Sequence, residues 1–213
     1  YNLNSNFKKY FQNYDFHNLY KELLNFCTVD LSAFYFDIRK DTLYCDDKAS
    51  EKRRSTILLL NIILNSLLRW FAPILSFTTE EIYRLLFKEK KSIHLEKFLT
   101  FPDQFKNEEL EKKWNDLIKI RNICNISIEE KRASKEIGSS LEADLKIQLD
   151  QKLKNTIDGI DFSEICITSN AEVSFKEDSE IIVETFKAKG NKCSICWKIN
   201  EASCGRSVCP QSS

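Results

Sequence analysis

The stretch STILLLNIILNSLLRWFAPILSFTTEEIYRLLF, residues 55–87, decides the fold. Polar residues interrupt its apolar run, and Asn61, Asn65 and Arg69 recur at intervals of four, which places them on one stripe of a helix. A membrane span needs about 20 mostly apolar residues, so interruptions this frequent argue against one. We therefore predict a core helix with one polar face from about Ala49 to Phe71.

The residues after this helix predict a break and a new start. Pro73 disfavours helical geometry at Ala72, so the first helix should bend or end there. Thr78 precedes Glu81 by three residues, which is the spacing of a capping box. A further helix is therefore predicted to begin at Thr78, with acidic residues in its first turn.

Similar helical patterns flank the stretch on both sides. From Asp15 to about Ile137 apolar residues recur at three-and-four spacing, and a third long helix is predicted from about Glu108 to Glu136. The chain holds only 4 glycines and 3 prolines, with 30 % charged residues, a composition that favours long helices over a turn-rich β sandwich. The predicted fold class is mainly α, with an antiparallel helical bundle over residues 1–137.

The periodicity changes after Gly138. Residues 140–149 alternate apolar and polar side chains, which is the pattern of a half-buried strand. Residues 164–169 and 179–188 are shorter strand candidates, and residues 151–159 are a candidate for a short helix. We expect a small α+β element over residues 138–189, followed by a C-terminal module over residues 190–213.

Net charge and composition limit the function classes. The 32 basic and 32 acidic residues cancel, so no overall field draws the chain to nucleic acid or to a membrane. The sequence contains no methionine and begins within a helical pattern, so we expect it to be a piece of a longer protein. We find no secretion signal, which favours a cytoplasmic location where cysteines stay reduced.

Four of the eight cysteines gather in the C-terminal module. Cys193 and Cys196 form a CxxC pair, and two thiolates at this spacing can share a tetrahedral zinc ion that Cys204 and Cys209 complete. Three alternatives stay open on these residues: a disulfide, a redox-active CxxC, and a damaged or truncated end. The remaining cysteines are interpreted as small buried apolar residues: Cys27, Cys45, Cys124 and Cys166.

The same module offers an aromatic and basic surface. Trp197 directly follows the cysteine pair, and the basic residues around it outnumber the acidic ones. Such a surface can stack a base and neutralise phosphate, or Trp197 can instead pack over the cysteine turn as its small core. The candidate RNA-binding residues are Trp197, Lys192, Lys198 and Arg206, together with Arg53 and Arg54 in the EKRR cluster.

The sequence carries no recognisable catalytic site. We find no glycine-rich phosphate loop, no GxSxG and no HExxH. His17 and His94 stand far apart without ligand or triad spacing, and we interpret both as structural or solvent-facing. No catalytic residue is therefore predicted.

Several blocks resemble a known family. DLSAFYFDIRKDTLY (30–44) and APILSFTTEEIY (72–83) resemble the anticodon-binding helical domain of bacterial isoleucyl-tRNA synthetases. IRNICNISIEEKRASKEIGSSLEADLKI (120–147) resembles the long helix and first strand that follow there. KCSICWK (192–198) resembles the start of the C-terminal zinc module of the same family. The resemblance covers about residues 15–210 of the chain.

That family joins isoleucine to its tRNA at the expense of ATP, with Mg²⁺. The resemblance implies that catalytic and editing domains lie upstream, because the HIGH and KMSKS signatures do not occur in this chain. The chain alone should then be inactive, and its implied role is to hold the anticodon stem-loop of isoleucine tRNA. The resemblance also implies one Zn²⁺ ion, a monomer, and no membrane partner.

The tail departs from the family pattern at one position. The family's second zinc pair resembles CGRC, whereas Ser207 stands here in place of the last cysteine and the next cysteine is Cys209. Either Cys209 completes the site through a wider loop, or the sequence near the end is altered. Without the resemblance, the alternatives are a stand-alone RNA-binding protein and a helical protein-interaction scaffold with a zinc clip. Affinity for tRNA that falls steeply with salt would argue against the scaffold.

Overall fold

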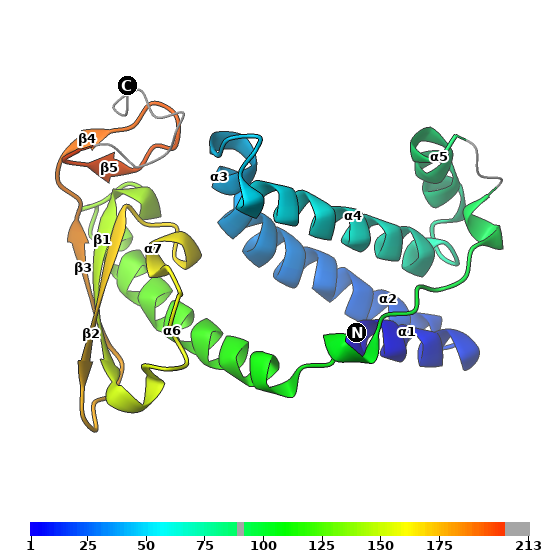
Figure 1. The fold of residues 1–213 in the computed structure, drawn as a ribbon, viewed down its shortest axis with the longest axis horizontal. Coiled ribbons are helices and arrows are strands. Elements are labelled where there is room, and N and C mark those ends of the chain that lie inside the picture. The colour runs from blue at the N-terminus through cyan, green and yellow to red at the C-terminus, as the bar shows by residue number, and fades with distance from the viewer. Residues whose placement is uncertain (89–91, 203–213) are drawn as a thin grey trace. The chain divides into compact units, whose positions relative to one another are not determined.

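A computed structural model of the protein describes residues 1–88 and 92–202. The chain forms two compact units (Figure 1). Unit 1 comprises Tyr1–Leu43 and Lys48–Asn107, and unit 2 comprises Tyr44–Asp47 and the chain from Glu108 onward. Within the described ranges, no helix combines the length and the apolar character that crossing a membrane requires.

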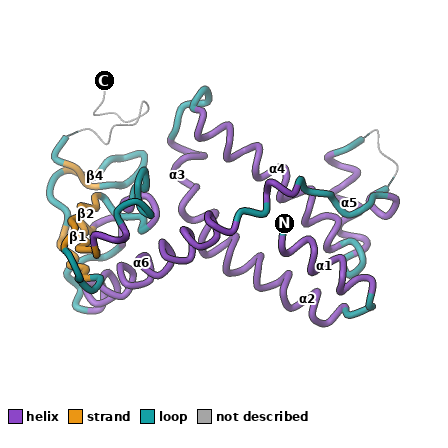
Figure 2. The backbone as a smooth tube through the Cα atoms, turned by 60° about the horizontal axis from the view of Figure 1, so that its bottom comes forward, coloured by secondary structure: helices purple, strands orange, loops and turns teal. Residues whose placement is uncertain are grey.

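Unit 1 is helical. In chain order its elements are α1 (Asn2–Gln12), α2 (Phe16–Asn25), the π-helical stretch η1 (Phe26–Phe36), α3 (Asp37–Cys45), α4 (Glu51–Phe71), α5 (Ser76–Leu86) and the 3₁₀ turns η2 (Ile93–Leu95) and η3 (Asp103–Phe105). The last two residues of α3, Tyr44 and Cys45, belong to unit 2. Helices α2 and α3 continue into one another through η1 (Figure 2). The helix predicted from about Ala49 to Phe71 is confirmed by α4.

Aromatic and leucine side chains form the main core of unit 1. Phe7 of α1 packs with Leu19 and Leu23 of α2 and with Trp70 of α4, and all four are buried. The rings of Phe7 and Trp70 meet edge-on, with centroids 4.9 Å apart. The Trp70 indole N–H donates to Asn4 Oδ1 at 3.0 Å, so the polar end of this buried ring is satisfied. Helices α1 and α2 therefore pack on the C-terminal part of α4.

The start of α5 differs from the prediction. The helix begins at Ser76, and no side chain of the described residues caps it, so the predicted capping box at Thr78 and Glu81 is wrong. A tight hydrogen-bonded turn spans Pro73 (residues 71–75), and the chain is helical again directly after it. Helix α4 ends at Phe71, but Ala72 before Pro73 keeps helical backbone angles (φ −52°, ψ −38°), so the predicted departure from helical geometry at Ala72 is wrong.

Unit 2 contains a mixed sheet with a helical cover. In chain order its elements are α6 (Glu108–Ala133), η4 (Ser140–Glu142), β1 (Ala143–Asp150), η5 (Gln151–Leu153), α7 (Phe162–Ile165), β2 (Asn170–Lys176), β3 (Ile182–Lys187), β4 (Asn191–Lys192) and β5 (Ile199–Asn200). The strand order is β2-β1-β3, with β2 parallel and β3 antiparallel to β1, and β4 pairs with β5 in a separate hairpin.

The core of unit 2 lies between α6 and one face of the sheet. Alternate residues of β1 point inward, as the period of the sequence predicts. The side chains that α6 and β1 bury together are Leu117, Ile120, Cys124, Ile128, Leu145, Ile147 and Leu149. A sheet that is apolar on one face needs such a cover, so α6 packs along it (Figure 1).

The packing of α6 on the sheet places this helix in unit 2. The sequence predicts α6 as part of a bundle over residues 1–137, whereas the two compact units divide at Asn107. The helical period shows that α6 has an apolar face but does not show which surface covers that face. The regions 138–189 and 190–213 both fall in unit 2, and their independence as domains stays a prediction.

Two shorter elements also differ from the prediction. Residues 164–169 form no strand, because Asp161 starts helix α7 by accepting a hydrogen bond from Ser163 N at 2.8 Å. The candidate helix at 151–159 reduces to the single turn η5. Strand β2 was not predicted, although its apolar residues alternate with polar ones: Ala171, Val173 and Phe175.

Candidate nucleic-acid interface

The C-terminal CxxC pair lies in the β4–β5 hairpin of unit 2. The chain turns between the two strands through Cys193 and Cys196, and both cysteines are buried. Gly190 precedes the hairpin with φ +119°, and a Cβ at this position would lie 2.2 Å from Asn200 O. Only glycine fits there, as the sequence reasoning about a tight turn expects.

The turn between the two cysteines is closed by three hydrogen bonds. Ile195 N donates to Cys193 Sγ at 3.5 Å. Trp197 N donates to Cys193 O at 3.0 Å, and Cys193 N donates to Lys198 O at 2.9 Å. Cys193 and Cys196 therefore fit two of the four positions around a structural zinc ion.

The other two predicted ligands, Cys204 and Cys209, lie outside the described residues, as does Arg206. Among residues 1–88 and 92–202, no group of three or more His, Cys, Asp or Glu side chains is arranged to hold a metal ion. The zinc site therefore stays a prediction, for which the structure describes the CxxC half.

A third cysteine lies against this turn. Cys45, at the end of α3, forms a buried cluster with Cys193 and Cys196. Its Sγ lies 4.0 Å from Ile195 O, across 150 positions of the chain. The sequence interpretation of Cys45 as a buried apolar residue is confirmed, but no local pattern could have shown which residues surround it. Of the other isolated cysteines, Cys124 and Cys166 are buried and Cys27 is half-buried.

Trp197 is held in an uncommon backbone conformation beside the cysteines. Its φ is +64°, and 59 % of the residue is exposed. The left-handed conformation costs a residue other than glycine roughly 1–2 kcal/mol. Lys192 Nζ lies 5.7 Å from the centroid of the indole ring, so a cation covers the ring. The structure thus brings together two of the predicted RNA-binding residues, Trp197 and Lys192.

The remaining predicted RNA-binding residues are placed differently. Lys198 Nζ is directed to helix α7, where it donates to Ser163 Oγ at 3.2 Å. Arg53 and Arg54 lie in unit 1, in the first turn of α4, which Ser50 caps by accepting from Arg53 N. Arg53 is half-buried, whereas Arg54 is exposed.

Formal charge is divided unevenly between the units. Unit 1 contains 16 basic and 11 acidic residues, and unit 2 contains 16 basic and 21 acidic residues. The prediction that no field draws the chain to nucleic acid is correct for the total charge, but unit 1 by itself is positive. A unit with a net positive charge attracts phosphate groups.

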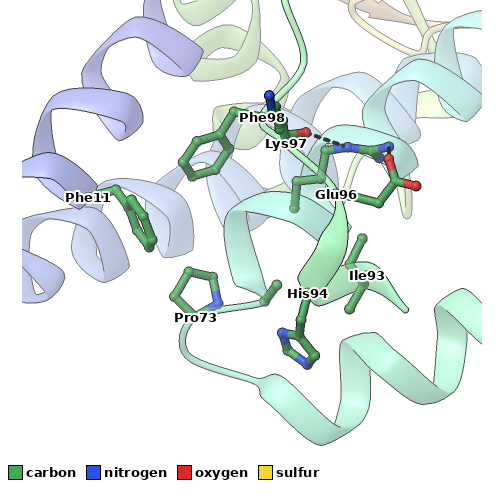
Figure 3. A pocket seen from close by; sticks show the side chains of 9 residues that line it. Phe11, Pro73, Ile93, His94, Glu96, Lys97 and Phe98 are labelled. Carbon is green, nitrogen blue, oxygen red and sulfur yellow. Dashed lines mark hydrogen bonds and ion pairs between the residues drawn. The ribbon is translucent and has the colours of Figure 1, made fainter. Parts of the chain in front are cut away.

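Unit 1 also contains a pocket of about 380 Å³ beside the C-terminal end of α4 (Figure 3). Phe11, Pro73 and Phe98 form its apolar wall, and the rings of Phe11 and Phe98 meet edge-on at 5.5 Å between centroids. His94 and Lys97 complete the rim, and both are exposed. Sequence reasoning missed this pocket, because its lining comes from segments far apart in the chain.

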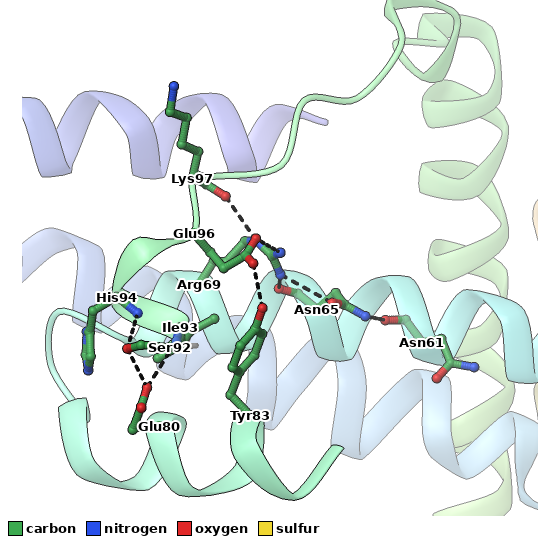
Figure 4. A network of polar contacts seen from close by, with 10 residues as sticks. All are labelled: Asn61, Asn65, Arg69, Glu80, Tyr83, Ser92, Ile93, His94, Glu96 and Lys97. Carbon is green, nitrogen blue, oxygen red and sulfur yellow. Dashed lines mark hydrogen bonds and ion pairs between the residues drawn. The ribbon is translucent and has the colours of Figure 1, made fainter. Parts of the chain in front are cut away.

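A polar network closes the inner side of this pocket (Figure 4). Arg69 Nη2 forms an ion pair with Glu96 Oε2 at 2.8 Å, Nε donates to Lys97 O at 3.0 Å, and Nη1 donates to Asn65 O at 2.9 Å. The Tyr83 hydroxyl donates to Glu96 Oε1 at 2.6 Å. The predicted polar stripe on α4 is confirmed, but its last member, Arg69, is buried rather than solvated. Arg69 therefore links α4 to the segment of Glu96 and Lys97 within unit 1.

The network perturbs the ionisation of two side chains. Burial and the hydrogen bond to Glu96 raise the pKa of Tyr83 to about 12. Hydrogen bonds from Arg84 and Ser92 hold the pKa of Glu80 below its usual value. Both shifts favour the protonation state already present at neutral pH, so they stabilise structure and do not prepare an acid or base for catalysis. The two histidines, His17 and His94, are exposed, in line with the sequence interpretation.

Comparisons with known proteins agree with the helical unit. Residues 1–148 match the family model described as the anticodon-binding domain of tRNA ligase. The chain is 67 % identical over 206 residues to an isoleucine–tRNA ligase of Pelagibacter ubique. The aligned region covers 97 % of this chain and 23 % of that relative. It is 40 % identical over 197 residues to an isoleucine–tRNA ligase of Agrobacterium fabrum. That aligned region covers 87 % of this chain and 20 % of the relative. The chain thus spans about a fifth of the length of these curated relatives.

Proposed function

Since this chain belongs to the family of anticodon-binding domains of tRNA ligases, we propose that it is the tRNA-binding part of an isoleucine–tRNA ligase. In this role it holds the anticodon stem-loop of isoleucine tRNA, so that the acceptor end reaches a catalytic domain of the same polypeptide. The observation that carries the proposal is the 67 % identity to the Pelagibacter ubique ligase over 97 % of this chain.

The two units support different parts of this role. Unit 1 has an excess of basic residues, and phosphate contacts of this kind fix the position of an RNA without reading its sequence. The hairpin of unit 2 presents Trp197 with Lys192 above its ring, and proteins bind the unstacked bases of RNA loops on such aromatic side chains. Binding and positioning are therefore the work of this chain's own residues.

The reaction itself needs groups that this chain does not contribute. ATP and Mg²⁺ belong to the proposed upstream catalytic domain, and an editing domain completes the proposed polypeptide. By itself the chain should neither activate isoleucine nor hydrolyse misacylated tRNA. We propose that the parent protein is a cytoplasmic monomer.

We also propose one structural Zn²⁺ ion, with Cys193 and Cys196 as two ligands and Cys204 and Cys209 as the others. The burial of the first pair and the Ile195 N–H bond to Cys193 Sγ support it. When bound, such an ion stabilises the fold of its module. Metal analysis of the purified chain should find one zinc per chain, lost in Cys193→Ser and kept in Cys27→Ser. Equal zinc in both variants would contradict this assignment.

Binding of labelled anticodon stem-loops, followed by fluorescence anisotropy, tests the main proposal. We expect the stem-loop of isoleucine tRNA to bind more tightly than stem-loops of other tRNAs, with affinity that falls as salt rises. Equal affinity for all stem-loops would indicate a general RNA-binding module. No salt-dependent binding at all would instead favour a protein-interaction scaffold.

A further inference from the structure

Three cysteines of unit 2 form a buried cluster of their own: Cys45, Cys193 and Cys196. Their exposed fractions are 5 %, 2 % and 4 %. Cys45 is the last residue of α3, whereas the other two lie in the turn of the β4–β5 hairpin, far along the chain. Free cysteines are often buried as small apolar residues, so burial by itself assigns Cys45 no role. The group that its sulfur contacts is therefore decisive.

The sulfur of Cys45 contacts the residue that directly precedes Cys196 in the turn. The Cys45 thiol donates to Ile195 O, with 4.0 Å between Sγ and the oxygen. Ile195 in turn donates its own N–H to Cys193 Sγ at 3.5 Å. The Ile195 carbonyl belongs to the peptide bond that leads into Cys196. The backbone of one residue therefore connects Cys45 with both members of the CxxC pair.

The other hydrogen bonds of the turn act on different groups. Trp197 N donates to Cys193 O at 3.0 Å, and Cys193 N donates to Lys198 O at 2.9 Å. Both bonds close the turn onto itself, from the first cysteine to the residues after the second. The thiol of Cys45 instead holds the carbonyl of Ile195 from outside the turn, from another segment of unit 2.

The segment that carries Cys45 is short. Tyr44–Asp47 belongs to unit 2, although the chain on both sides of it belongs to unit 1. Cys45 is the buried residue of these four, and Tyr44 and Asp47 are exposed. The contact of Cys45 with the hairpin turn therefore anchors this segment in unit 2.

We propose that Cys45 is a positioning residue for the zinc site: its thiol holds the Ile195 peptide group and so fixes how Cys193 and Cys196 present their sulfurs. This inference rests on the proposed zinc ion and assigns a role to a residue from a distant part of the chain. Groups that hold metal ligands in place typically raise metal affinity by about 10–100-fold. Cys45 acts through Ile195 and not as a ligand, since among residues 1–88 and 92–202 no three such side chains are arranged to hold a metal ion.

The contact also works in the opposite direction. If segment 44–47 strengthens zinc binding, then zinc binding must stabilise that segment by the same free energy, because such a coupling is reciprocal. Zinc in the hairpin should therefore slow amide hydrogen exchange at the end of α3. A cysteine that only fills space in a core would show no such response to the metal.

The test uses the full purified chain and Zn²⁺, with zinc affinity measured by competition against a chromogenic chelator. We expect Cys45→Ala to bind zinc roughly tenfold more weakly, near the lower end of the effect of such groups, because a thiol is a weak donor. Cys45→Ser keeps a donor and should lie closer to the wild type. Cys27→Ala is the matched control, because Cys27 is a half-buried cysteine of unit 1, and it should bind zinc like the wild type.

Two further measurements separate positioning from ligation and from folding. With Co²⁺ in place of zinc, Cys45→Ala should keep the wild-type thiolate-to-cobalt absorption, whereas Cys193→Ser should lose part of it. Hydrogen–deuterium exchange of residues 37–47 should be slowed by zinc in the wild type and not in Cys45→Ala. If Cys45→Ala does not fold, Cys45→Ser and the zinc-dependent exchange of the wild type decide the question.

The possible failures are distinct. Wild-type zinc affinity in Cys45→Ala, or exchange at residues 37–47 that zinc leaves unchanged in the wild type, would overturn the positioning role and leave the zinc site standing. Loss of cobalt absorption in Cys45→Ala would make Cys45 a ligand and would overturn it as well. Absence of zinc binding by the wild type would overturn both the positioning role and the zinc site, but not the proposed binding of tRNA.

Discussion

Units 1 and 2 contain the same number of basic residues, and they differ by ten acidic ones. The formal net charge is therefore +5 for unit 1 and −5 for unit 2, which the zero total of the chain conceals. Charges in water act over a Debye length of about 8 Å at physiological salt, so a binding surface responds to its own unit. Charge balance is thus informative when it is counted for each folded unit.

Both units have an apolar core, but unit 1 adds a largely buried polar network to it. Unit 2 is stabilised by apolar contacts between α6 and the sheet. At the α4–α5 corner of unit 1, by contrast, one arginine, one glutamate and one tyrosine form a largely buried polar network. Apolar cores tolerate a change of pH, whereas a network of ionisable groups does not. The apolar core of unit 2 and the polar network of unit 1 should therefore respond differently to side-chain truncation and to pH.

The largest effect is expected from Leu145→Ala in β1. Leu145 is 1 % exposed in the core of unit 2, and leucine-to-alanine changes at such sites cost about 2–5 kcal/mol. Urea unfolding followed by circular dichroism should show this loss in the transition of unit 2. Ile182→Ala in β3, where the side chain is half exposed, should change it far less. Equal effects of the two substitutions would show that the sheet face is not the core.

A somewhat smaller effect is expected from Arg69→Met in unit 1. The Arg69 side chain is only 7 % exposed, and its removal takes away the ion pair with Glu96. Breaking a buried pair in this way should cost about 2–3 kcal/mol of the free energy of unfolding. Arg84→Met removes an ion pair whose arginine is 66 % exposed, and it should cost less than about 1 kcal/mol. If both variants lose the same stability, burial of the network is not what matters.

Alkaline pH should destabilise unit 1 through Tyr83. The pKa of Tyr83 is about 12 in the folded protein and about 10 when unfolded, so the folded state keeps the proton longer. This contribution is complete below about pH 10 and is lost as the pH rises toward 12. Tyr83→Phe should lessen the fall of stability between about pH 10 and about pH 12, measured by urea unfolding. An unchanged fall in the variant would assign the pH dependence to other groups.

The smallest effect is expected from Arg54→Ala, which tests the charge contrast. Arg54 is an exposed cation in the first turn of α4 in unit 1. If it contacts phosphate, its loss should reduce the slope of log tRNA affinity against log salt by about 1. Lys152→Ala removes an exposed cation from unit 2 that is already paired with Asp178, and it should leave the slope unchanged. The reverse result would place the phosphate contacts in unit 2.

Local patterns predicted several elements correctly. Helix α6 and strand β1 each bury one apolar face, whereas the buried residues of α4 include Thr56, Ser66 and Arg69. The errors occur where a single side chain or a short turn decides the structure. Asp161 caps α7 where a strand was expected. Helix α5 begins at Ser76, directly after the turn around Pro73 and before Thr78.

The sequence likewise identified some residues of the candidate site and missed others. Cys193, Cys196 and Trp197 were selected from the sequence because their spacing is local. Cys45 was not selected as a site residue, since nothing within a few positions of it points to the CxxC turn. Lys198 was selected for its charge, but the structure directs it to Ser163.

The sequence by itself determined the helical character of unit 1, the change to strands after Gly138 and the family of the chain. These features depend on periodicity and on blocks of neighbouring residues, which a linear pattern preserves. Only the tertiary structure decided that α6 covers the sheet, that Arg69 is buried against Glu96, and that Cys45 lies on the CxxC turn. Each of these contacts joins residues far apart in the chain. Their partners are chosen by packing and by the pairing of buried charge, and no local pattern records that choice.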